Sequence, residues 1–169
     1  MTPLDNGNRW AVLGVAVFLL GCTAVVARQT PALALVNESP SLPRGVYARV
    51  PAGDVVRGAT VAVPQPERAR SYLASLGMPG EVALIKRVAG VGGDRICSSN
   101  GRVVTPVAVM AVRDRDRRGT ILPRWTGCRR LDADEVFLVG DTAGSFDSRY
   151  FGPVRRDEVI GVYREVLTW

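Results

Sequence analysis

The sequence contains no histidine, and a single lysine stands among its 22 basic residues. The absence of histidine excludes Ser-His-Asp and Cys-His catalysis as well as histidine-ligated metal sites, and we expect neither a metal nor another cofactor. The lysine, Lys86, lies in the apolar segment EVALIKRVAG (81–90), and every other basic residue is arginine. Arginine keeps its proton at usable pH, whereas apolar surroundings lower the pKa of a lysine so that it can act as a base. Lys86 is therefore the first candidate for chemistry; the alternative is a surface lysine left by codon bias.

Charge is also absent from eighteen residues near the N-terminus, WAVLGVAVFLLGCTAVVA (10–27). This length predicts a transmembrane helix and is long for the apolar part of a cleaved signal peptide. We expect a short cytoplasmic tail (1–9), an anchor (10–27) and an extracytoplasmic domain (28–169), hence a single-pass protein of the inner membrane with its domain in the periplasm. A lipoprotein signal is the alternative, because residues 19–22 resemble a lipobox that would make Cys22 the lipidated residue.

Two of the three cysteines, Cys97 and Cys128, lie in the expected extracytoplasmic domain. An even pair outside the cytoplasm predicts a disulfide. Two buried free thiols would fit only a cytosolic domain.

The chain is basic, with a formal net charge of +6, and one cluster of arginines stands out, RDRDRRG (113–119). A basic balance suits nucleic acid or an anionic membrane surface. Few aromatic residues flank the cluster and aspartates interrupt it, so we interpret it as a solvated loop and expect no nucleic-acid partner.

The segments after residue 28 are short, rich in β-branched residues and separated by turns, which predicts a mainly β domain. One helix is expected over 66–77, where Pro66 leads an apolar pattern of helical spacing and Gly77 ends it. Asn100-Gly101 predicts a hairpin between strands 94–99 and 102–110. The other predicted strands are 45–50, 59–64, 81–90, 134–141 and 158–167.

In the strand predicted over 81–90, alternation places Val82, Leu84, Lys86 and Val88 on one face. The amine of Lys86 would then enter from an apolar wall, which is the environment a neutral lysine requires.

Three motifs follow the expected anchor in a fixed order. They are Ser41-Leu42-Pro43, then Lys86-Arg87 with Gly90, Gly93 and Asp94, and last Gly140-Asp141 with SFDSRYFG (145–152). Together they resemble the signal peptidase I superfamily of Ser-Lys membrane proteases. The resemblance implies an antiparallel β fold with one or two short helices, preceded by a single N-terminal transmembrane helix.

Further details resemble the conjugative-transfer branch of that superfamily, the TraF-type pilin-processing proteases. They are the box SPSLPRGVY (39–47), a small domain with one anchor, and the cysteine pair. The chain departs from the housekeeping enzyme by one residue fewer before Pro43, by Leu42 in place of methionine, and by Thr142 after Gly140-Asp141. These departures put general secretory substrates in doubt.

The resemblance also implies a role for individual residues. Ser41 would attack the scissile carbonyl and a neutral Lys86 would take its proton. The Ser41 backbone N–H and the Ser39 hydroxyl would hold the oxyanion, and Ser145 would orient the amine of Lys86.

A second group of residues is expected to support the site without touching substrate. Asp147 and Arg149 would form a structural ion pair that ties their loop to the strand of Lys86.

The substrate implied by the resemblance is a pre-pilin or leader peptide, bound extended along an edge strand with its small side chains in pockets. The apolar segment PALALV (31–36) suits contact with the membrane, and other mating-channel proteins are expected partners. Hydrolysis and cyclising transfer both fit. The alternatives are a general signal peptidase I, a cytosolic autocleaving Ser-Lys protease of the repressor type, and a membrane-tethered β module that binds anions through its arginines.

Overall fold

The computed structural model describes residue 10, residues 12–18 and residues 31–169, and the chain divides into two units, residues 1–32 and 33–169. In the first unit, residues 12–18 are helical. Within the described ranges, no helix is both long enough and apolar enough to cross a membrane. The predicted tail (1–9) and most of the predicted anchor, with Cys22, lie outside the described residues.

The second unit is mainly β, as the turn-rich sequence predicts, and its larger sheet is antiparallel throughout. The strand order in this sheet is β1-β2-β11-β3-β4-β9-β10. Its strands are β1 (Ala34–Asn37), β2 (Gly45–Arg49), β3 (Thr60–Val63), β4 (Leu84–Val91), β9 (Glu135–Val139), β10 (Val154–Arg155) and β11 (Gly161–Thr168).

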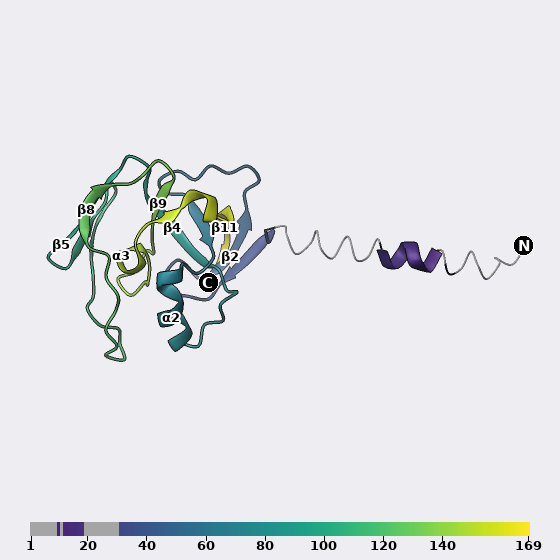
Figure 1. Ribbon diagram of the computed structural model, residues 1–169, viewed down its shortest axis with the longest axis horizontal. Helices are drawn as coiled ribbons and strands as arrows, with labels where there is room; N and C mark the ends of the chain where they lie inside the picture. The colour runs from purple at the N-terminus through teal and green to yellow at the C-terminus, as the bar shows by residue number, and fades with distance from the viewer. Residues whose placement is uncertain (1–9, 11, 19–30) are drawn as a thin grey trace, which may run out of the picture. The chain divides into compact units, whose positions relative to one another are not determined.

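A second, four-stranded sheet has the order β7-β6-β5-β8 and lies at one end of the domain (Figure 1). Its strands are β5 (Arg95–Ser99), β6 (Arg102–Val104), β7 (Val109–Ala111) and β8 (Gly127–Arg130). Asn100 and Gly101 both have positive φ, 50° and 69°, as the tight turn between β5 and β6 requires.

The strand expected over 102–110 is in fact two strands, β6 and β7. The chain turns between β6 and β7 because Pro106 has no N–H to donate a hydrogen bond to a neighbouring strand. The Thr105 hydroxyl stabilises the turn by accepting from the backbone N–H groups of Val107 (3.3 Å) and Ala108 (3.1 Å). Strand β8 lies between the arginine cluster and residue 134, where no strand was predicted.

The predicted helix is present as α2 (Glu67–Ser75), which buries Ala69 and Leu73 against the larger sheet. Gly77 follows it with φ 79°, a left-handed conformation typical of a helix end. A second short helix, α3 (Ser148–Phe151), and the 3₁₀ turn η1 (Arg156–Glu158) complete the domain.

Strand β4 lies between β3 and β9, so both of its edges are paired, and core residues pack on both of its faces. Leu84 and Val88 belong to the main core, while Ile85 on the opposite face packs with Leu42 in a smaller cluster. The strand starts later than predicted: the N–H of Val82 closes a turn on the carbonyl of Pro79, and this side chain is 42% exposed.

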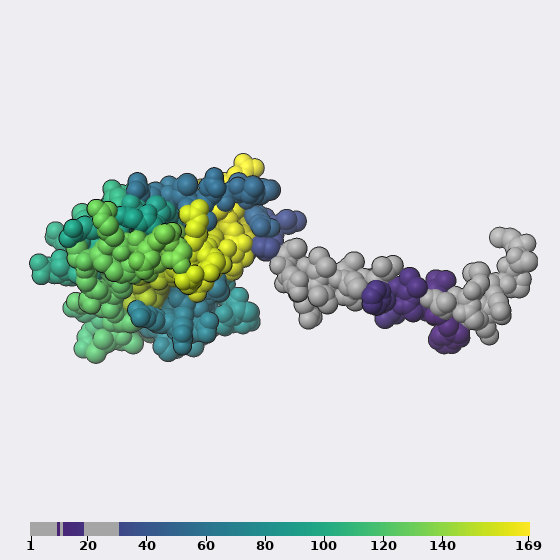
Figure 2. All heavy atoms as spheres, turned by 45° about the horizontal axis from the view of Figure 1, so that its top comes forward, coloured from purple at the N-terminus to yellow at the C-terminus, as the bar shows by residue number. Residues whose placement is uncertain are grey.

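The C-terminal strand joins segments that are distant in the sequence. β11 pairs with β2 on one side and with β3 on the other. Figure 2 shows the result, with the C-terminal residues (yellow) between blue and green segments of the chain. The loop after β1 lies next to the middle of β4.

Candidate active site

The loop between β1 and β2 carries Ser41, and Asn37 at the end of β1 holds it. The Asn37 amide nitrogen donates to the carbonyl oxygens of Ser39, Leu42 and Pro43 at 3.0–3.1 Å, and its amide oxygen accepts from the N–H of Ser39 at 3.2 Å. Asn37 is buried, so these bonds replace those it would make with water. The sequence alone did not single out Asn37, although an Asn before a Ser-Pro turn is a known loop-forming signal.

Ser41 and Lys86 meet inside the domain, although 45 residues separate them. Lys86 Nζ donates to Ser41 Oγ at 3.0 Å and to its neighbour's carbonyl, that of Ile85, at 3.2 Å. Both side chains are only 4% exposed. A lysine and a serine at this distance can exchange a proton directly, since 2.6–3.2 Å is the range required.

Burial lowers the pKa of Lys86 from 10.5 to about 8. Loss of hydration is the largest cause; the carboxylate of Asp147 raises the pKa, and the guanidinium of Arg149 lowers it. Near pH 8 a large fraction of the amine is therefore neutral, and a neutral amine can accept the serine proton.

Ser39 lies beside Ser41 and is bonded to it twice. The Ser39 hydroxyl donates to Ser41 Oγ at 3.0 Å, and it accepts from the Ser41 N–H at 3.1 Å. The two groups expected to hold an oxyanion are thus adjacent, but in this state they are engaged with each other. A rotation of the Ser39 side chain would free both donors.

Ser145 does not make the hydrogen bond to Lys86 that we expected. Its hydroxyl is buried and has no hydrogen-bond partner within residues 31–169. It nevertheless lines the same cleft as Ser41 and Lys86. Gly140 leaves room for the Ser145 side chain at this position. A Cβ on Gly140 would lie 2.2 Å from Ser145 Oγ and 2.7 Å from the carbonyl oxygen of Ser41.

Asp147 and Arg149 form a fully buried ion pair at 2.7 Å, with 0% and 2% of their side chains exposed. Asp147 also accepts from the N–H of Gly140, and Arg149 donates to carbonyl oxygens of Ala111, Thr142 and Ser145. These partners fasten the loop to the ends of β9 and β7. None of the hydrogen bonds that the pair makes within residues 31–169 reaches β4, so the expected tie to the strand of Lys86 is not made by direct contact.

The tie to β4 is made by another ion pair, which sequence analysis did not assign. Arg87, next to Lys86, donates twice to Asp141, at 2.8 and 3.0 Å. The N–H of Asp141 in turn donates to the carbonyl oxygen of Ser41 at 2.6 Å. Arg87 and Asp141 thus connect the strand of the lysine to the loop of the serine, and both residues belong to the quoted motifs.

A cleft of about 650 Å³ opens onto Ser41 and Lys86. Most of its lining is apolar, and the edge strand β1 ends beside it. An extended peptide with small apolar side chains fits such a surface, since an edge strand offers free backbone groups for pairing. The apolar lining residues are Val36, Pro40, Leu73, Leu76, Met78, Val82, Ala83, Leu84, Ile85 and Phe146.

Cys97 and Cys128 are joined by a disulfide, as their number and position predict. They are opposite each other on β5 and β8 of the small sheet. Neither lines the cleft, so the bond supports the fold and takes no part in the chemistry.

Comparisons with known proteins agree with the resemblance read from the motifs. A family model described as "Signal peptidase, peptidase S26" matches residues 8–169. The chain is 34% identical to "Plasmid transfer protein TraF" of Escherichia coli over 172 aligned positions, covering 94% of each chain. It is 30% identical to "Probable conjugal transfer protein TraF" of Sinorhizobium fredii, covering 100% and 95%. A shorter match, 31% over 96 positions, covers 50% of this chain and 57% of "Signal peptidase I V" of Bacillus subtilis.

Proposed function

This chain belongs to the signal peptidase family, peptidase S26, and from that premise we propose that it is a serine endopeptidase with a Ser41–Lys86 dyad. The observation that carries the proposal is the hydrogen bond of 3.0 Å between two buried side chains, one of them a lysine whose pKa is lowered to about 8. A lysine kept only to stabilise the fold would gain by contact with a carboxylate, and Lys86 contacts a hydroxyl and a carbonyl instead.

In the first half of the reaction, the neutral Lys86 amine removes the proton of Ser41 Oγ as the oxygen attacks the scissile carbonyl. The Ser41 N–H and the rotated Ser39 hydroxyl donate to the carbonyl oxygen as it becomes negative. Lys86 then gives its proton to the leaving amine, which departs and leaves an acyl ester on Ser41.

In the second half, Lys86 is neutral again and activates the acceptor. A water molecule gives hydrolysis, and the substrate's own amine gives a cyclic product. Either acceptor loses its proton to Lys86, which returns it to Ser41 when the ester breaks. We assign Ser145 the role of accepting from the amine during this cycle. Its burial on the cleft wall, without a hydrogen-bond partner in the described domain, supports this assignment.

We propose a pre-pilin or leader peptide as the substrate and conjugative transfer as the setting. Two relatives named for plasmid or conjugal transfer cover 94–100% of this chain, whereas the relative named signal peptidase I V covers 50% of it. That difference favours the conjugative role over general removal of secretory leaders.

The proposed location is the inner membrane, with residues 10–27 as a single anchor and the peptidase domain in the periplasm. The Cys97–Cys128 disulfide supports an oxidising compartment. Exposed apolar side chains on neighbouring strands support contact with lipid. Val36 of β1 and Leu167 of β11 both pair with Val46 of β2, one on each side of it, and they are 62% and 60% exposed.

The test compares the full-length protein with Ser41→Ala and Lys86→Arg for cleavage of a pilin precursor encoded in the same transfer system, followed by mass spectrometry. Each substitution should lower the rate by about four orders of magnitude or more. Ser99→Ala, an exposed serine on β5, is the matched control and should retain activity.

Lys86→Arg separates the proposal from a non-enzymatic, anion-binding module. Arginine preserves the charge but cannot act as a neutral base. Circular dichroism establishes that the variants fold. Substantial cleavage by folded Lys86→Arg would refute the dyad.

A further inference from the structure

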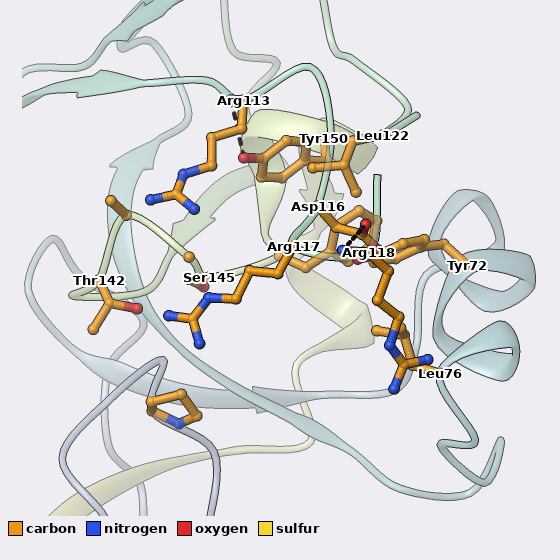
Figure 3. A pocket seen from close by; sticks show the side chains of 14 residues that line it. Tyr72, Leu76, Arg113, Asp116, Arg117, Arg118, Leu122, Thr142, Ser145 and Tyr150 are labelled. Atoms are coloured by element: carbon orange, nitrogen blue, oxygen red, sulfur yellow. Dashed lines mark hydrogen bonds between the residues drawn. The ribbon is translucent and has the colours of Figure 1, made fainter. Parts of the chain in front are cut away.

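A second pocket, of about 490 Å³, adjoins the cleft and is lined by three arginines, Arg113, Arg117 and Arg118. We propose that it is a subsite for a carboxylate of the substrate peptide, an inference that rests on the proposed peptidase function. Figure 3 shows Arg113 and Arg117 extending toward the loop of Thr142 and Ser145, and Arg118 extending toward Leu76.

The loop that carries these arginines is fixed in place, although its composition is that of a solvated loop. Asp116 accepts from the N–H groups of Arg118 (2.8 Å) and Thr120 (2.9 Å), which closes the turn. The hydroxyl of Tyr72, on α2, donates to the other oxygen of Asp116 at 3.1 Å. The loop is therefore held against α2, and its arginine side chains are exposed there.

The three guanidinium groups are uncompensated. Within residues 31–169, none of them has a hydrogen bond or an ion pair, whereas Arg115 of the same loop donates to the Gly119 carbonyl and Arg124 pairs with Asp114. The one carboxylate in the pocket wall, that of Asp116, already accepts from three groups. Free guanidinium groups favour carboxylates, which they bind with paired hydrogen bonds.

The arginine pocket continues the cleft that holds Ser41 and Lys86. The residues that line both are Pro40, Leu76, Gly144, Ser145 and Phe146. The end of β1 and residues 82–86 line only the cleft, so the arginine pocket extends it away from these segments. A peptide bound across Ser41 enters this pocket within a few residues of the scissile bond.

An aromatic wall makes the pocket selective for an acidic group with an apolar stem. Phe146 packs between Tyr72 (4.4 Å between ring centroids) and Tyr150 (5.2 Å). Such a wall contacts methylene groups while the arginines take the charge. Because this pocket shares five residues with the cleft, we assign it to the peptide and not to a lipid headgroup.

The experiment is cleavage of a proteome-derived peptide library by the full-length protein in neutral phosphatidylcholine vesicles, with the cleaved bonds identified by mass spectrometry. We expect aspartate, glutamate or the C-terminal carboxylate to be enriched about five-fold at one fixed distance from the cleaved bond, as for an exposed ion pair. A second library with amidated C-termini distinguishes the sources: enrichment that persists belongs to side chains, and enrichment that disappears belongs to the terminus.

The variants are the triple substitution Arg113→Gln, Arg117→Gln, Arg118→Gln and the single reversal Arg117→Glu. The triple variant should bring the ratio of acidic to neutral peptides down to about one, and Arg117→Glu should shift the preference toward lysine and arginine at that position. Arg164→Gln, which removes an exposed arginine of β11 outside both pockets, is the matched control and should keep the acidic preference.

The outcomes separate the two proposals. Cleavage without an acidic preference, or a preference that survives the triple substitution, overturns the subsite alone. Failure of the wild-type protein to cleave any peptide overturns the peptidase function and the subsite with it. If the arginine substitutions change activity only in phosphatidylglycerol vesicles, whatever the charge of the peptide, the arginines contact lipid and the inference is wrong.

Discussion

Lys86→Met should remove activity and at the same time stabilise the protein, because the lysine is held in a site that disfavours its charge. The pKa of Lys86 is about 8 in the folded protein, against 10.5 for an unhindered lysine. A difference of this size corresponds to about 3 kcal/mol of folding free energy. Methionine has a similar length and no charge, and Ser41 Oγ would still accept from the hydroxyl of Ser39.

The sign follows from proton binding. Between pH 8 and 10.5 the unfolded chain holds the Lys86 proton and the folded protein does not, so the free energy of unfolding rises with pH in this window. Below pH 8 the full cost of burying the charge is present. At pH 7, Lys86→Met should therefore raise the free energy of unfolding by up to about 3 kcal/mol, and the melting temperature by roughly 5–10 °C.

The assay is urea unfolding of the full-length protein in detergent, followed by tryptophan fluorescence, at pH 7 and at steps up to pH 10.5. The stability difference between Lys86→Met and wild type should shrink as the pH rises. Arg164→Met, at an exposed position, is the control and should change stability by about 0.5 kcal/mol or less. A methionine variant that is no more stable at pH 7, or a difference that does not change with pH, would refute the reasoning.

The same pKa predicts the pH profile of wild-type cleavage. Only the neutral amine can accept the Ser41 proton, so kcat/KM should rise with pH through about 8 and then level. At pH 6 it should be about 100-fold below the plateau. An essential group that titrates near 10.5 would mean that Lys86 is not desolvated in the working enzyme.

Three further predictions concern the surroundings of the dyad. Gly140→Ala should destabilise the domain by about 1–3 kcal/mol and reduce cleavage, because the new Cβ would lie 2.2 Å from Ser145 Oγ. Thermal melts measure the loss of stability, and Gly80→Ala, where a new Cβ would meet no atom within 4 Å, is the control. Asp141→Asn should lower kcat about 10-fold and leave the pH profile unchanged, because it loosens the link between Arg87 and the Ser41 loop. Asp157→Asn, in the exposed ion pair with Arg155, is the control and should not lower kcat. Equal effects of the two substitutions would disprove the positioning role of Asp141. Replacing Cys97 and Cys128 by serine should lower the free energy of unfolding by about 3–4 kcal/mol, because the disulfide joins residues separated by 31 positions. A melting temperature of the wild-type protein that does not change with reductant would contradict this prediction.

The sequence by itself determined the family of this protein and much of its local structure. With no histidine, a lone lysine in an apolar strand was the first candidate for a base, and three ordered motifs identified the family. The helix at 67–75 and the turn at Asn100-Gly101 also followed from the sequence, because helix ends and tight turns depend on neighbouring residues.

Tertiary structure decided which of the polar residues touch. Asp147 and Arg149 bind the ends of β9 and β7 and not β4, and Ser145 lies on the cleft wall without bonding to Lys86. The link between the segments of Ser41 and Lys86 instead runs through Arg87 and Asp141, which are 54 residues apart. Such contacts depend on the order of strands in the sheet and on where each loop returns, and a pattern of neighbouring residues does not encode either.

The arginine cluster is the clearest example of this division. Its composition alone is that of a solvated loop, and the sequence offers no sign that it approaches Ser41. In the folded domain, Tyr72 of α2 holds Asp116, and the loop then lines the pocket that adjoins the cleft. The sequence determined the charge of these arginines. Their position beside the cleft depends on the hydrogen bond between Tyr72 and Asp116, 44 residues apart, which forms only once the helix and the loop pack on the same side of the domain.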